Sequence, residues 1–364
     1  MTQQPDMVSF SSSDELLRVE NLKVDFRTEG GVVHAVDDVS YSLRRGEVLA
    51  VVGESGSGKS VSAMTLMGLT RAANADISGT ATLSDGTELI GASERQLRRI
   101  RGRRISMIFQ DPMSALTPVY RVGDQIAEQI RTHEKVSRGA AHARAVELLR
   151  RVGIPKPADR ARAYPHEFSG GMRQRVMIAM ALSCSPEILI ADEPTTALDV
   201  TIQAQILNEI EELRIETGVG VILITHDLGV VAEVANRVVV MYAGRVVEQA
   251  GLRELFKDPM HPYTWGLLGS IPRIDRDRPH RLPTIAGSPP SLLDPPQGCH
   301  FITRCPHRMP KCTEEPDLVV TGGEASHRDR CWLTLDQKRS LRVVDGAIGL
   351  PAKLPDLPTS EESA

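Results

Sequence analysis

The segment that most restricts the fold is a glycine-rich stretch, GESGSGKS, at positions 53–60. It follows a short apolar run at 47–53 and precedes residues 59–69, which have the pattern of a helix. Glycines let the backbone approach a phosphate closely, and N–H groups at the start of a helix then face its negative charge. An unrelated glycine turn is the alternative, but it does not require a strand before it and a helix after it. We therefore predict a nucleotide-binding loop in an α/β protein.

The side chains of this phosphate loop have different expected roles. Lys59 reaches the β- and γ-phosphates, and the Ser60 hydroxyl ligates Mg²⁺. The glycines allow the backbone to make most of the other contacts. The predicted nucleotide-binding residues of the loop are Gly53, Glu54, Ser55, Gly56, Ser57, Gly58, Lys59 and Ser60.

An acidic pair at the end of a second apolar run supplies the other half of the site. The run at 188–191 leads directly into Asp192 and Glu193. A strand that ends in a carboxylate can bring Asp192 beside a Mg²⁺ ion, and Glu193 can then act as a general base on the attacking water. Acidic strand ends also occur on ordinary protein surfaces. Beside a phosphate loop, the catalytic interpretation is favoured.

Strand and helix patterns alternate along the first two thirds of the chain. Strands are expected at 16–26, 188–194 and 220–227, and helical periodicity covers 124–152 and 199–216. Such alternation is typical of an α/β protein with a largely parallel core sheet. Aromatic residues make up only 4% of the chain, so we expect the core to consist mainly of Val, Ile, Leu, Ala and Met.

Charge and hydropathy argue against two classes of protein. The net charge is −4, from 43 basic and 47 acidic residues, which gives no overall attraction to nucleic acid or to anionic lipid. The first residues lack the charged and apolar regions of a secretory signal, and the longest apolar runs are too short for a membrane helix. If the protein acts at a membrane, other subunits must span it.

Three further motifs extend the pattern. Residues 168–172 read FSGGM and lead into a helical stretch, Gln110 follows a strand pattern, and His226 follows another. A lone Gln or His at a strand end is usually just solvated, but the order of motifs resembles the ATP-binding-cassette (ABC) family over residues 15–250. In that family Gln110 matches the glutamine loop, 168–172 the signature sequence and His226 the switch histidine. Phe168 and Met172 depart from the usual leucine and glutamine.

The resemblance implies a fold and a dimer. The fold is a P-loop nucleotide-binding domain with a parallel core sheet, an antiparallel β subdomain and a helical signature subdomain. Two such subunits pair head to tail, so that the signature residues of one close over the ATP of the other. The signature set is Ser169, Gly170, Gly171 and Met172.

The resemblance also implies roles for single residues. Glu193, His226 and Gln110 are the catalytic set, and Ser60, Gln110 and Asp192 hold Mg²⁺. Phe26 either stacks on the adenine ring or packs as an ordinary strand aromatic. Asp199 either belongs to the dimer-interface loop or caps the helix that follows it.

A narrower family resemblance spans residues 15 to about 335. The sequence HPYT at 261–264, the segment 110–118 and the segment 167–176 resemble the ATPases of oligopeptide and dipeptide permeases. This implies transport-coupled ATP hydrolysis at the cytoplasmic face of the inner membrane. The implied partners are a second ATPase subunit, identical or paralogous, two transmembrane permease subunits and an extracytoplasmic substrate-binding protein, with no nucleic acid. Nickel or other small-solute importers share these features, and an ABC ATPase acting on nucleic acid is a more distant alternative.

Four of the five cysteines lie close together near the C-terminus. Cys299, Cys305, Cys312 and Cys331 have the spacing C-x5-C-x6-C-x18-C. Four thiolates can hold a [4Fe–4S] cluster or a tetrahedral Zn²⁺ ion. The lack of C-x2-C pairs favours the cluster, and the resemblance favours it too, since some peptide-permease ATPases carry one. Unliganded thiols are the third possibility.

These features divide the chain into four parts. We expect a flexible N-terminus at 1–14, the ABC nucleotide-binding domain at 15–258, a small irregular extension with the four cysteines at 259–335, and a flexible tail at 336–364. The many prolines after residue 259 argue against long helices in the extension.

Overall fold

The computed structural model describes residues 14–111, 115–194, 200–271, 284–322, 326–344 and 347–350. Its largest element is an eight-stranded sheet with the order β10-β11-β9-β8-β3-β7-β6-β5. Five adjacent strands run parallel: β8 (Arg237–Tyr242), β3 (Val48–Val52), β7 (Gly220–Thr225), β6 (Ile188–Asp192) and β5 (Ile105–Ile108). Three short strands extend one edge antiparallel: β9 (Arg245–Gly251), β11 (Arg328–Asp329) and β10 (Val319–Val320).

The parallel strands lie at the centre of the molecule. Every residue of β3, β5, β6 and β7 is buried. Strands covered on both faces need no polar residue at alternate positions, which explains their continuous apolar sequences. The expected α/β class with a largely parallel core sheet is confirmed.

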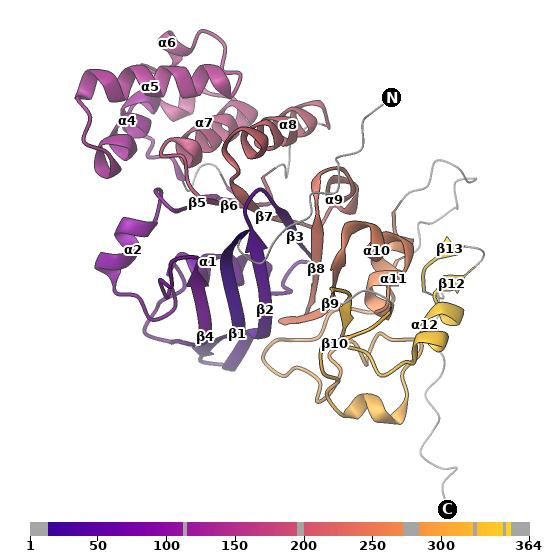
Figure 1. Ribbon diagram of the computed structural model, residues 1–364. Coiled ribbons are helices and arrows are strands. Elements are labelled where there is room, and N and C mark those ends of the chain that lie inside the picture. Colours follow the sequence, from indigo (N-terminus) through magenta and orange to yellow (C-terminus); the bar gives the residue numbers. More distant parts are fainter. Residues whose placement is uncertain are drawn as a thin grey trace, which may run out of the picture.

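A second, antiparallel sheet packs beside the first. It has the order β2-β1-β4, from β2 (Gly31–Arg44), β1 (Glu15–Thr28) and β4 (Ala75–Leu83). Figure 1 shows it in indigo and purple, next to α1 (Lys59–Leu66), with α2 (Glu94–Ile100) further out. Leu17, Leu22 and Val36 from this sheet share one apolar cluster with Val51 of β3 and Leu66 of α1. The antiparallel subdomain and the phosphate loop are therefore built on the same core.

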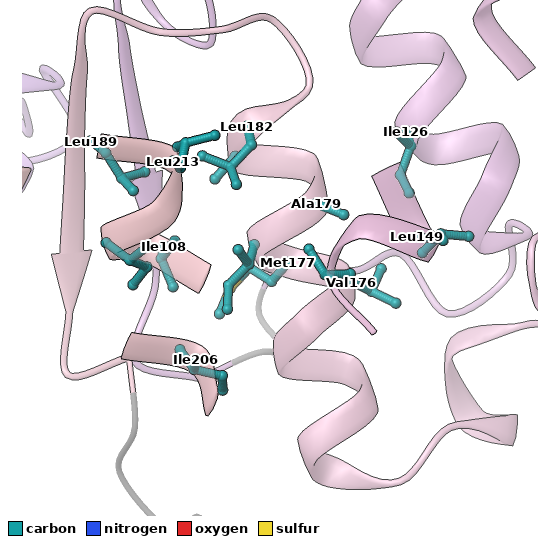
Figure 2. Close-up of a cluster of buried hydrophobic side chains, with 14 of the residues drawn as sticks. Ile108, Ile126, Leu149, Val176, Met177, Ala179, Leu182, Leu189, Ile206 and Leu213 are labelled. Atoms are coloured by element: carbon teal, nitrogen blue, oxygen red, sulfur yellow. The ribbon is translucent and has the colours of Figure 1, made fainter. Parts of the chain in front are cut away.

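A group of helices forms the opposite end of the cassette (Figure 1). It contains α4 (Val122–His133), α5 (Arg138–Arg151), α6 (Pro157–Arg160), α7 (Gly170–Leu182) and α8 (Val200–Thr217). Figure 2 shows how they are joined to the sheet: Ile126 of α4 and Leu149 of α5 lie on one side of α7, and Leu189 and Ile108 lie on the other. Helix α7 thus connects the helical group to β5 and β6.

One helix prediction needs correction. The helical periodicity over 124–152 is divided between α4 and α5, with a break at 134–137. Ser137 is the N-cap that begins α5, because its side chain accepts a hydrogen bond from the backbone N–H of Ala140. Glu134, at the end of α4, forms an ion pair with Arg144 of α5 and so fixes the turn between the helices.

The remaining elements are short. Within the cassette they are the 3-10 turn η2 (Pro165–Glu167), just before α7, and the helices α9 (Leu228–Val234) and α10 (Leu252–Lys257). The C-terminal residues add α11 (Pro262–Gly269), the 3-10 turn η3 (Pro310–Thr313), α12 (Leu335–Leu341) and the pair β12 (Val343–Val344) and β13 (Ala347–Ile348). In α11 a proline occupies the first turn, where its missing N–H costs nothing. Among the described residues, no helix has the length and apolar character that crossing a membrane requires.

Helix α12 continues the structured region past residue 336, where we expected a flexible tail to begin. Thr334 and Gln337 form a capping box at its start. Lys338 is buried and donates to both carboxylate oxygens of Asp329, at 2.7 and 2.9 Å. Burial raises the pKa of Asp329, and the neighbouring Lys338 opposes that rise.

We predict that Lys338→Ala destabilises the protein by about 3–5 kcal/mol, because Asp329 then remains as a buried charge without its cation. The loss of stability is measured as the change in the free energy of unfolding, obtained by urea titration. Arg339→Ala, which removes the neighbouring and exposed ion pair with Asp258, should lower the stability far less, because solvent screens an exposed pair. Equal losses in the two variants would contradict the assignment.

Candidate nucleotide-binding site

The phosphate loop connects the end of β3 to the start of α1, as the sequence predicts. Gly53, Gly56 and Gly58 all have positive φ angles. A Cβ atom on Gly53 would lie 2.1 Å from the Met241 carbonyl oxygen, and one on Gly58 would lie 2.3 Å from that of Ala35. Two of the three glycines are therefore required by close backbone contacts as well as by backbone conformation.

Lys59 is held inside the loop. Its side chain Nζ donates to the carbonyl oxygens of Gly53 at 2.8 Å and Glu54 at 2.9 Å. Only 5% of the residue is exposed. Burial lowers the pKa of Lys59, while Glu193, Asp192 and Glu54 oppose this effect. The ammonium group is thus placed among several oxygen atoms, where a phosphate can compete for it.

Ser60 and Asp192 meet although they lie far apart in the sequence. The Ser60 hydroxyl donates to Asp192 Oδ1 at 2.9 Å. Burial raises the pKa of Asp192, and the Ser60 hydrogen bond offsets only part of that rise. A hydroxyl and a carboxylate side by side are the oxygen donors that Mg²⁺ prefers, so these residues fit the expected ion.

The three residues expected to be catalytic lie together, because Gln110 and His226 both contact the carboxylate of Glu193. Gln110 Nε2 donates to Glu193 Oε2 at 3.0 Å, and His226 Nδ1 lies 3.2 Å from Glu193 Oε1. Glu193 has a φ of 47°, a strained value for a residue with a side chain. Its backbone N–H donates to the Ile224 carbonyl, which helps to hold this conformation.

The signature residues lie at the start of α7. Ser169 is the N-cap, and its hydroxyl accepts a hydrogen bond from the Met172 N–H. Ser169 and Gly170 are exposed, whereas Gly171 and Met172 are half-buried. A helix N-terminus with exposed N–H groups can receive an anion from another molecule.

Two further predicted residues, Phe26 and Asp199, are not among the contacts described above. Phe26 is half-buried and packs against the cluster below the antiparallel sheet. Asp199 lies outside the described residues.

Three residues that no sequence pattern predicts support the site from a distance. Gln174 of α7 donates to the carbonyl of Pro194, next to Glu193, at 2.6 Å. Tyr263 and Arg304, from the extension, both contact Glu54 of the phosphate loop. No local spacing signals such contacts, since each joins segments that are distant in the sequence.

The four clustered cysteines line one small pocket, together with His261, His307 and Trp332. None of the four forms a disulfide bond. Burial raises the pKa of Cys299 to about 11 and of Cys305 to about 12, and it raises that of Cys331 as well. Within the part of the chain that the structure describes, no group of three or more His, Cys, Asp or Glu residues has the geometry to hold a metal ion.

Taken together, the loop, the acidic pair, Gln110, His226 and the Ser-Gly-Gly helix start define a P-loop ATPase of the ABC class. Residues 36–196 match the family described as "ABC transporter", and residues 247–312 match "Oligopeptide/dipeptide transporter, C-terminal region". The chain belongs to the ABC transporter family of ATPases, within the oligopeptide and dipeptide group.

Curated relatives resemble the chain over most of its length. The dipeptide transport ATP-binding protein DppD of Bacillus subtilis is 52% identical over 336 residues, which cover 92% of this chain and 98% of the relative. The oligopeptide transport ATP-binding protein OppD of Escherichia coli is 52% identical, with coverage of 84% and 90%. OppD of Mycobacterium tuberculosis is 55% identical over 88% of this chain, which spans only 52% of that relative.

Solved structures agree with the fold. A dimer of the cassette MJ0796 in a post-hydrolysis state, bound to ADP and Pi, gives a TM-score of 0.59 at 26% identity, covering 65% of this chain and 99% of that one. CbiO1 of Clostridium perfringens gives a TM-score of 0.56 at 30% identity, covering 67% and 92%. The expected nucleotide-binding fold is confirmed.

Proposed function

We propose that this protein is the ATP-hydrolysing subunit of a membrane importer of dipeptides and oligopeptides. The observation that carries the proposal is the meeting of Gln110 and His226 at Glu193, beside a phosphate loop and the Ser60–Asp192 pair. The match of residues 247–312 to the oligopeptide/dipeptide C-terminal region supports the substrate class. The names of the DppD and OppD relatives support it as well.

In this proposal the loop binds the phosphates of ATP and Lys59 neutralises part of their charge. Ser60, Asp192 and Gln110 would hold Mg²⁺, which when bound offsets the charge of the β- and γ-phosphates. Glu193 accepts a proton from the attacking water as the water oxygen bonds to the γ-phosphorus. The bond to the bridging oxygen breaks, leaving ADP and phosphate. Gln110 and His226 keep the Glu193 carboxylate oriented toward that water.

The signature residues act on the nucleotide of a facing subunit. Exposure of Ser169 and Gly170 at a helix start supports this role, and so does the dimeric state named for the ADP-bound MJ0796 cassette. ATP then favours the closed dimer, because the facing signature adds phosphate contacts that the open state lacks. Two permease subunits and an extracytoplasmic binding protein complete the importer, with this chain at the cytoplasmic face of the inner membrane.

We predict that cells lacking their native copy regain uptake of labelled di- and tripeptides when this chain is expressed with its permease subunits. Glu193→Gln should abolish uptake, because ATPase turnover falls by about 10²–10⁴ while ATP still binds. Uptake is measured on a panel that also contains Ni²⁺. Uptake of nickel without peptides would favour the alternative importer class, and normal ATP hydrolysis in Glu193→Gln would contradict the role of Glu193.

The trans arrangement predicts complementation between two inactive variants. Lys59→Ala disables the phosphate loop and Ser169→Arg blocks the signature, so each variant alone should lose nearly all ATPase activity. Mixing the purified variants should restore activity, because mixed dimers contain one site with an intact loop and an intact facing signature. ATPase rate against mixing ratio is the measurement. Full activity of Ser169→Arg alone would contradict the proposal.

We further propose that the cysteine pocket takes up a [4Fe–4S] cluster, which requires the four thiols to move closer together than the described geometry places them. The observation that favours it is that all four cysteines line one small pocket. Backbone N–H groups of Phe301, His307 and Leu333 are directed at the thiols of Cys299, Cys305 and Cys331. Such N–H contacts stabilise thiolate ligands and tune the clusters they hold.

Anaerobic purification should yield about four iron and four sulfide per chain. Cys312→Ser should lower both contents strongly, whereas Cys184→Ser, at the remaining cysteine, should leave them unchanged. Zinc without sulfide would indicate the alternative metal, and a protein free of both metals would contradict the proposal.

A further inference from the structure

The C-terminal extension holds the phosphate loop at Glu54 through two separate contacts. The backbone N–H of Glu54 donates to the hydroxyl of Tyr263 at 2.8 Å. The Glu54 carboxylate accepts two hydrogen bonds from Arg304, from Nη1 at 2.7 Å and from Nη2 at 3.1 Å. Both the backbone and the side chain of this loop residue are therefore bonded to residues from outside the 15–258 segment that carries the rest of the ATP site.

Arg304 is fixed independently of Glu54. Its Nε donates to the carbonyl of Ala286 at 3.0 Å, and Nη2 donates to that of Ile285 at 3.2 Å. The guanidinium also lies over the ring of Tyr242, which packs against Tyr263 with ring centroids 4.6 Å apart. Only 4% of Arg304 is exposed. A planar group held at so many points presents a rigid, preorganised partner to the carboxylate.

The charge of Glu54 explains why such a partner is needed. The Glu54 carbonyl accepts a hydrogen bond from Lys59, so this residue borders the place where phosphates are expected. A carboxylate there without a counter-charge would repel the anionic nucleotide and would compete for the Lys59 ammonium. Arg304 neutralises the carboxylate.

We propose that Arg304 and Tyr263 are positioning residues for ATP binding, which act by holding Glu54 of the phosphate loop. The extension then contributes two positioning residues to the nucleotide-binding site. This inference rests on the proposed ATP site, and it adds to that site a contribution from the region that distinguishes the peptide group. Because Arg304 acts on binding of the phosphates, its loss affects the KM for ATP more than kcat.

The test compares two buried arginines of the extension. Arg304→Met should raise the Kd and KM for ATP about tenfold and change kcat by less than about twofold. Arg330→Met is the matched control: the Arg330 side chain is 7% exposed, and its ion pairs are with Asp38 of β2 and with Glu315, not with Glu54. The control should leave KM within about twofold of the natural protein. Equal KM changes in both variants would overturn the proposal.

A second-site variant separates charge neutralisation from simple structural support. In Arg304→Met/Glu54→Gln the unpaired carboxylate is gone, so KM should return to within about threefold of the natural value. No recovery would overturn the proposal. If Arg304→Met does not fold, Tyr263→Phe serves instead: it removes only the hydroxyl and should raise KM about threefold, and an unchanged KM would overturn the proposal.

Lys59→Ala distinguishes this inference from the site on which it rests. If Lys59→Ala loses ATP binding and Arg304→Met keeps normal binding, the ATP site stands and the positioning role is wrong. If Lys59→Ala binds ATP normally, the proposed ATP site itself fails, and the role of Arg304 fails with it.

Discussion

The site depends on the parallel pairing of β3, β7 and β6. Val52 of β3 lies opposite Thr225 of β7, and Ile224 of β7 lies opposite Asp192 of β6. Parallel strands end at the same edge of a sheet, so the residues that follow them are neighbours whatever their distance in the sequence. This register alone brings the phosphate loop, Glu193 and His226 to one edge. Gln110, two residues beyond the end of β5, joins the same edge.

Burial strengthens the interactions between the charged side chains at this edge of the sheet. Lys59 and Asp192 are only 5% and 4% exposed, and each shifts the pKa of the other in the direction that favours its charged form. In such surroundings the interaction between charges is stronger than in water, so the arrival of a phosphate changes the local balance more than it would at a surface. The strained backbone of Glu193 contributes to the site as well, because in this conformation the carboxylate contacts Gln110 and His226.

The sequence was sufficient for the parts of the structure that depend on local patterns. Apolar runs identified β3, β6 and β7, because a strand buried on both faces needs a continuous apolar sequence. The GESGSGKS segment identified the loop, because its conformation requires glycine at particular positions. The break between α4 and α5 was missed, since a single N-cap serine does not disturb the periodicity on either side. The Arg304–Glu54 pair joins residues 250 positions apart, and only the folded chain brings them together.

The extension is integrated into the cassette by a buried charge of the cassette itself. Glu248 of β9 is fully buried, and it accepts hydrogen bonds from the backbone N–H groups of Met260 and His261 and lies 2.8 Å from His327 Nε2. Burial lowers the pKa of His327, but the Glu248 contact outweighs this and leaves it raised. The stability from this pair is therefore present at low pH and is lost as the pH rises through the folded-state pKa of His327. Among the described residues, the hydrogen-bond partners of the Glu248 side chain are Met260, His261 and His327, all from the extension, so the central sheet and the extension depend on one another.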